Sequence, residues 1–126
     1  MSEKNVEIVR RLYEGFWETG DFPPELIHPD VVWDFSKFRG RLVKETYLGV
    51  EGVREFLAEW SGTWDDWEVE LEELLDAGEK VVAIERNRGR SKGLEVPVEW
   101  QVGVVLTLAD GKLIRSEFYA SPHEAL

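Results

Sequence analysis

The segment LEVPVEWQVGVVLTLADGKLIRSEFYA, residues 94–120, decides the expected fold. Over 98–108, apolar residues alternate with a mixed set, and such a period of two indicates a strand with one fully apolar face. Asp110-Gly111 follows this run and precedes a second one, which is typical of a tight β-hairpin turn. Because the first strand is long, we expect a bend or bulge at Gly103 and a curved sheet whose concave side encloses a pocket.

Length and composition limit the number of domains, the possible chemistry and the possible partners. The chain of 126 residues predicts one domain, 1–126, that is large enough to bury a core. The absence of cysteine excludes disulfide bonds and thiolate chemistry. A net charge of −11, from 15 basic and 26 acidic residues, argues against nucleic acid and membrane surfaces as partners. No stretch resembles a signal peptide or a membrane span, which favours a cytoplasmic location.

Helical and extended periodicities alternate before the hairpin. Apolar residues at helical spacing predict helices over about 3–19 and 49–64. A short strand is expected over 31–35, and alternation predicts further strands from residue 67 and over 80–90. Helices followed by four antiparallel strands indicate an α+β fold. We expect a conical, curved antiparallel sheet that wraps around the N-terminal helices and leaves an internal cavity.

Four short motifs follow this order: VRRLYEGF (9–16), HPDVVWDF (28–35), GVEGVREF (49–56) and DGKLI (110–114). With the order of elements, they make the whole chain resemble the nuclear-transport-factor-two-like superfamily, which includes the ketosteroid isomerases, and within it the SnoaL-like domains. The resemblance implies a conical fold around a cavity, frequent homodimers through the outer face of the sheet, and usually no cofactor. It does not specify a reaction, because the superfamily hosts both enzymes and binding domains.

A ketosteroid-isomerase-like proton transfer is one activity that the resemblance suggests, and Tyr13 matches the tyrosine that holds the substrate oxygen. The expected base falls on Phe35, and Asp34 is one residue away, on the opposite face of a strand. The second acid falls at or near Val104. Since two of the three groups are missing, this reaction is not expected, and Tyr13 is interpreted as a hydrogen-bonded core residue.

Two other activities of the superfamily match less well. A limonene-epoxide-hydrolase-like site would use Arg86, but Arg88 stands where an acid is expected two residues later. A SnoaL-like cyclase would need an acid on the last strand, where Glu117 is the only one. If Phe118 faces inward, Glu117 faces outward.

Arg86 is the charged residue whose orientation matters most. Arg86 lies an even number of residues from the apolar Val82, so both side chains are expected on the same face of the strand, which suggests the inner face. A buried arginine needs a carboxylate such as Asp34 or an anionic ligand. In the alternative, Glu85 and Asn87 face inward and Arg86 belongs to a solvated basic stripe. Alternation leaves both orientations open.

The six tryptophans of the chain favour an apolar, aromatic pocket, with a solidly filled core as the alternative. The candidate catalytic residues are Tyr13, Asp34 and Arg86. The residues expected to bind a ligand are Tyr13, Trp33, Phe56, Trp60, Arg86, Trp100, Val104 and Phe118. The two histidines are far apart in sequence, so we expect no metal site, and no cofactor is expected either.

The preferred function is a domain that binds a small hydrophobic molecule, in a homodimer. A cofactor-independent isomerase, cyclase or hydrolase that uses general acid–base chemistry in the cone is the first alternative. The second is a non-enzymatic dimeric interaction module, in which the basic segment 36–47 or the outer sheet binds a protein partner. The basic segment is otherwise a lid over the pocket or a solvated loop.

Overall fold

The computed structural model describes residues 2–36, 46–91, 93, 96–119 and 125. The elements, in chain order, are α1 (Ser2–Thr19), η1 (Pro24–Leu26), β1 (Ile27–Asp34), β2 (Thr46–Leu48), α2 (Gly49–Thr63), β3 (Trp64–Ala77), β4 (Lys80–Ser91), β5 (Pro97–Ala109) and β6 (Lys112–Tyr119). Every predicted element is present, and β2 is an additional short strand that alternation did not reveal. Most of the predicted basic segment, residues 37–45, lies outside the described residues.

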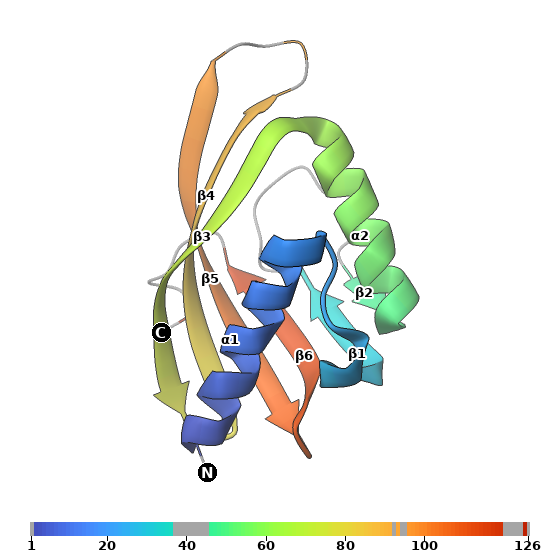
Figure 1. Ribbon diagram of the computed structural model, residues 1–126, viewed down its shortest axis with the longest axis vertical. Coiled ribbons are helices and arrows are strands. Elements are labelled where there is room, and N and C mark those ends of the chain that lie inside the picture. The colour runs from blue at the N-terminus through green and yellow to red at the C-terminus, as the bar shows by residue number, and fades with distance from the viewer. Residues whose placement is uncertain (1, 37–45, 92, 94–95, 120–124, 126) are drawn as a thin grey trace.

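The strands form one curved sheet in the order β2-β1-β6-β5-β4-β3. Neighbouring strands are antiparallel except β1 and β6, which run parallel, so the sheet is mixed and not wholly antiparallel as expected. Both helices lie on the same side of the sheet: α1 packs against β3 and β4, and α2 packs mainly against β1 and β2 (Figure 1). The predicted α+β class and the curved sheet are confirmed.

The β5–β6 hairpin turns at Asp110 and Gly111, as predicted. Both residues have positive φ, 52° and 77°, which is the conformation of a type I′ turn. A bend or bulge was expected at Gly103, and the bulge is wrong, because Gly103 pairs in unbroken register with Ile84 of β4. The irregularity lies instead between β5 and β6, at residues 107–108. The curvature of β5 is therefore achieved without interrupting its pairing at the glycine.

Apolar side chains gather on both faces of the sheet, in unequal amounts. The larger cluster lies on the inner face, between the sheet and the two helices, and includes Val9, Leu12, Val31, Val53, Val81 and Val104. A smaller cluster on the outer face consists of Val82, Ile84 and Val105, with Leu75, Tyr119 and Ala125 packed against it. Among the described residues, no helix is long and apolar enough to cross a membrane.

Candidate functional site

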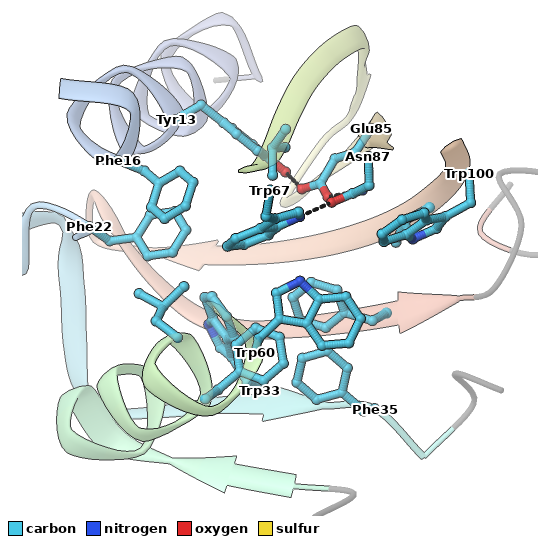
Figure 2. A pocket seen from close by; sticks show the side chains of 15 residues that line it. Tyr13, Phe16, Phe22, Trp33, Phe35, Trp60, Trp67, Glu85, Asn87 and Trp100 are labelled. Carbon is cyan, nitrogen blue, oxygen red and sulfur yellow. Dashed lines mark hydrogen bonds between the residues drawn. The ribbon is translucent and has the colours of Figure 1, made fainter. Parts of the chain in front are cut away.

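A cavity of about 60 Å³ lies within the inner cluster. It is bounded by α1, α2 and the inner faces of all strands except β2. Its lining residues, most of them aromatic, are Tyr13, Phe16, Phe22, Trp33, Phe35, Phe56, Leu57, Trp60, Trp67, Val69, Glu85, Asn87, Trp100, Val102 and Phe118 (Figure 2). About 10–15 Å³ of such volume accommodates one water molecule, so the cavity has room for a few waters or a compact organic group.

The aromatic walls are packed ring against ring. Phe35 stacks on Phe118 with ring centroids 4.2 Å apart, and on Phe56 at 4.6 Å. Trp60 contacts both Trp67, at 6.1 Å, and Trp100, at 6.2 Å, in edge-to-face geometry. Such offset and edge-to-face pairs stabilise by about 0.5–1.5 kcal/mol beyond the burial of area, so they hold the walls in defined positions.

A small group of polar side chains stands in this apolar wall. The hydroxyl of Tyr13, from α1, donates a short hydrogen bond to Glu85 Oε2, from β4. Asn87, two residues further on β4 and only 4% exposed, places Nδ2 3.4 Å from Glu85 Oε1. The indole N–H of Trp67 donates to Asn87 Oδ1 at 3.0 Å (Figure 2). We call Tyr13, Glu85, Asn87 and Trp67 the polar cluster.

Burial shifts the acidity of two members of the polar cluster. Burial raises the pKa of the Glu85 carboxyl, although the hydrogen bonds from Tyr13 and Asn87 act in the opposite direction. Burial raises the pKa of the Tyr13 hydroxyl well above its usual range, and the nearby Glu85 carboxylate adds to the effect. The residue Glu85 as a whole is half-buried, but its carboxyl group lies in the interior. Such a carboxyl group takes up and releases protons at a higher pH than an exposed one.

The cavity wall holds a carboxyl group but no basic side chain. None of the described residues that line it is a lysine, arginine or histidine. No group of three or more metal-ligating side chains occurs among the described residues. Trp33 adds a buried indole N–H for which the described part of the chain offers no hydrogen-bond acceptor. The site can therefore accept hydrogen bonds at Glu85, and the indole N–H of Trp33 is a further hydrogen-bond donor.

Six of the residues expected to bind a ligand line the cavity: Tyr13, Trp33, Phe56, Trp60, Trp100 and Phe118. Val104 is buried in the inner core but is not part of the lining. Phe35, the position matched to the missing base, does line the cavity, so an apolar ring stands where a carboxylate was sought. Tyr13 faces the interior and donates its hydroxyl hydrogen bond to Glu85.

The inward orientation of Arg86 is wrong. Its guanidinium lies on the outer face, where it forms ion pairs with Glu72, at 2.9 Å, and Glu99. Asp34 is not its partner: it also lies outside the cavity and pairs with Arg115 at 2.6 Å. Val82 suggested an inner face for Arg86 because it is apolar, but its apolar neighbours belong to the outer cluster.

The alternative orientation of β4 is correct. Its inner face carries residues that were not among the expected site residues. Glu85 and Asn87 share the inner face with Val81 and Ala83, which are fully buried. In the sequence, the acid and the amide alternate in phase with Val81 and Ala83, but Val82 and Ile84 make the other face apolar as well, so the pattern did not identify the inner face. Trp67 was expected only as the first residue of a strand, and its indole proves to be the donor to Asn87.

A curved mixed sheet around two helices, with an aromatic cavity on the inner face, defines the class of nuclear-transport-factor-two-like and ketosteroid-isomerase-like domains. The model of the SnoaL-like domain family matches residues 9–116, and the chain belongs to this family. No curated protein matches the chain.

Solved structures confirm the fold. TerC, co-crystallised with polyporic acid, is 24% identical with a TM-score of 0.76, and the alignment covers 96% of this chain and 94% of TerC. A putative SnoaL-like polyketide cyclase from Jannaschia sp. CCS1 is 24% identical, with a TM-score of 0.75 and coverage of 94% and 85%. A hypothetical protein with a ketosteroid isomerase-like fold from Catenulispora acidiphila DSM 44928, in complex with trimethylamine, is 18% identical, with a TM-score of 0.74 and coverage of 91% and 85%. At these identities the likeness shows the fold alone.

Proposed function

We propose that this domain binds a small, largely apolar molecule in the cavity, with the polar cluster as its orienting contact. The observation that carries the proposal is the Glu85 carboxyl group in a wall built largely of aromatic rings. Burying a carboxyl group costs stability, and a core selected only for packing would hold an apolar side chain there. A few polar groups placed in an apolar concave site are typical of small-molecule sites.

The structural neighbours support this proposal. TerC is described with polyporic acid, and the Catenulispora protein with trimethylamine. The volume of about 60 Å³ favours a compact ligand, or a compact part of a larger one. A larger molecule requires the aromatic side chains to rotate away, which costs the ring contacts that hold the walls in place.

The first experiment is thermal unfolding with a panel of compact apolar and aromatic compounds. A ligand at 100 times its Kd stabilises the native state by about 2.7 kcal/mol, which raises the Tm by several degrees. The variant Val69→Phe places a larger side chain in the cavity wall, so we expect it to remain folded and to lose the shift. Val96→Phe, the same change at a site that is 70% exposed, is the matched control and retains the shift.

Two results would contradict the proposal. The first is that no member of a broad panel raises the Tm of the wild type. The second is that Val69→Phe responds as strongly as Val96→Phe, which would place the bound compound outside the cavity.

A general acid–base enzyme is the second candidate function, and Glu85 favours it. A carboxyl group whose pKa is raised by burial in an apolar cavity is suited to exchange protons with a substrate. Tyr13, which contacts the carboxyl group, positions it. An enzyme of this kind loses turnover in Glu85→Gln while it still binds substrate. A compound that binds without being converted by the wild type supports the binding function instead.

We also propose that the domain is a homodimer formed through the outer face of the sheet, as the resemblance implies. The outer face of β4 carries exposed charged groups such as Arg86 beside the cluster around Ile84, whose members are already buried within the chain. Small-molecule binding and dimerisation are compatible because they use opposite faces of the sheet.

A further inference from the structure

Glu85 has hydrogen-bond partners but no cationic partner among the residues that the structure describes. Its two oxygens receive the hydroxyl of Tyr13 and, at 3.4 Å, the amide of Asn87. Strands β3 and β5 place the apolar Leu71 and Val102 beside it. Charged groups in protein interiors are paired with an opposite charge, because hydrogen bonds alone do not repay the loss of hydration. When Glu85 is ionised, no opposite charge among the described residues therefore balances its negative charge.

The polar cluster is nevertheless oriented for the ionised form. An indole N–H can only donate, so Trp67 fixes the carbonyl oxygen of Asn87 toward itself. The amide NH₂ of Asn87 is then the group that faces Glu85, and it too can only donate. Through these hydrogen bonds, Trp67 orients Asn87 so that its amide donates to one oxygen of Glu85. The hydroxyl of Tyr13 donates to the other oxygen. A carboxyl group that accepts a hydrogen bond at each of its two oxygens is better suited to the ionised form than to the protonated form.

The opposite walls are suited to a cation with apolar substituents. Figure 2 shows Glu85 and Asn87 on one side of the cavity and the rings of Trp33, Trp60 and Phe35 on the other. Tryptophan faces attract cations through the negative potential of the ring, and ring walls also bury methyl or methylene groups. The chain carries a net charge of −11, which raises the local concentration of cations around it.

We propose that the cavity binds a protonated amine with small apolar substituents, whose N–H group donates to the Glu85 carboxylate and whose substituents lie against the tryptophan rings. This inference rests on the proposed function, since it names the chemical class of the molecule bound in the same cavity. The volume of about 60 Å³ restricts the ligand, or the part of it beside Glu85, to a compact group. The ammonium charge supplies the cationic partner that the described part of the chain does not give to Glu85.

The experiment compares two compounds of the same shape and different charge, tert-butylammonium and tert-butanol. Each is titrated into the ¹⁵N-labelled protein, and the indole N–H resonance of Trp67 reports occupancy, because this group belongs to the polar cluster. We expect the ammonium ion to bind the wild type with at least about tenfold higher affinity than Glu85→Gln, since a charge-assisted hydrogen bond is lost. The affinity for tert-butanol changes little between the two proteins.

Arg86→Ala is the matched control for the substitution of Glu85. It changes the neighbouring residue on the same strand, but its side chain lies on the outer face, in ion pairs with Glu72 and Glu99. We expect this variant to bind tert-butylammonium as the wild type does. A loss of binding equal to that in Glu85→Gln would mean that a disturbance of strand β4, not the loss of the cavity carboxylate, abolishes binding, and would overturn the inference.

A pH titration of the wild type tests the inference without any substitution. Protonation removes the charge of Glu85, so the affinity for tert-butylammonium falls as the pH is lowered through the pKa of this carboxyl group. The affinity for tert-butanol stays constant. Tyr13 is the other titratable residue in the described lining, and its raised pKa keeps it neutral throughout this range.

The outcomes separate the two proposals. If tert-butanol shifts the Trp67 resonance as strongly as tert-butylammonium, or if Glu85→Gln binds both equally, the cavity is a binding site but the cation inference is wrong. If neither compound shifts the indole resonances of the lining tryptophans, the cation inference is wrong, and the proposed function is decided separately by the thermal unfolding panel. Tighter binding of the ammonium ion, lost in Glu85→Gln and at low pH, establishes both.

Discussion

Glu85 is a carboxyl group in the interior whose two hydrogen bonds reduce the cost of burial without removing it. Tyr13 and Asn87 act to lower the pKa of the carboxyl group, yet burial dominates and raises it. The folded protein therefore holds the proton of Glu85 more tightly than the unfolded chain does. This difference links the stability of the fold to pH through a single residue.

The sign of this linkage gives a prediction. Between the ordinary glutamate pKa, about 4.3, and the raised pKa in the fold, the native state binds more protons at Glu85 than the unfolded state. The contribution of Glu85 is therefore fully favourable below pH 4.3 and is lost as the pH rises through the raised value. In Glu85→Gln this decrease is absent, so the free energy of unfolding of the variant, relative to the wild type, increases from pH 4 to pH 7.

Urea denaturation at a series of pH values measures this difference. Subtracting the wild-type curve from the variant curve removes the contribution of the other acidic residues, which is shared by both proteins. Arg86→Ala, on the opposite face of β4, is expected to give a flat difference over the same range. A flat difference for Glu85→Gln as well would show that the carboxyl group titrates as if it were exposed.

At the scale of elements, a glycine in α1 allows the helix to pack closely against the segment that follows it. A Cβ atom on Gly15 would lie within 2.7 Å of Cδ of Pro23, closer than such atoms approach each other. Alanine is intrinsically better than glycine in a helix by up to about 1 kcal/mol, but the rigid proline ring cannot move aside. We therefore expect Gly15→Ala to lower the free energy of unfolding by about 1–3 kcal/mol, the usual cost of overpacking.

Gly62→Ala, in α2, provides the comparison because nothing lies within 4 Å of a Cβ atom at that position. Only helix propensity acts there, so this variant should be as stable as the wild type or more stable by up to about 1 kcal/mol. Chemical denaturation of both variants measures the contrast. If Gly15→Ala proves as stable as Gly62→Ala, the contact between α1 and Pro23 is looser than the structure shows.

The elements also show where prediction from the sequence succeeds and where it fails. The β5–β6 hairpin was predictable because its alternation is long and its Asp110-Gly111 turn requires positive φ at both residues. The faces of β4 were not, because this strand is apolar on both sides near its start. Val81 and Ala83 lie in the inner core while Val82 and Ile84 form the outer cluster, so alternation alone assigns no inner face. The three-residue strand β2 is too short to show any period.

At the scale of the whole molecule, the architecture was predictable and the candidate site only partly so. The order of elements and the motifs along the chain identified the fold and placed Tyr13, Trp33 and Phe118 in the interior. The polar cluster depends on contacts between residues far apart in the sequence: 72 positions separate Tyr13 from Glu85. Such a pairing follows from how a helix lies across a curved sheet, and no local pattern encodes it. Whether aromatic rings leave a cavity or fill it depends likewise on packing in three dimensions.

The outer face of the sheet gives the last prediction, because it determines how two copies meet. Beside the cluster around Ile84, it carries exposed ion pairs such as Arg88–Glu68, at 3.6 Å. Exposed pairs of this kind contribute only about 0–1 kcal/mol to folding, so reversing a charge there leaves the fold intact. If the homodimer forms through this face, the reversal places like charges in the interface and weakens association.

We therefore expect the wild type to sediment with the mass of two chains and Arg88→Glu to shift toward the mass of one at the same concentration. Arg54→Glu, which reverses an equally exposed arginine on α2, is expected to leave the dimer unchanged, since α2 lies on the inner side of the sheet. Sedimentation equilibrium over a range of concentrations measures all three proteins. A wild type with the mass of one chain throughout would exclude the dimer, and dissociation by Arg54→Glu alone would place the interface on the helical side, beside the cavity.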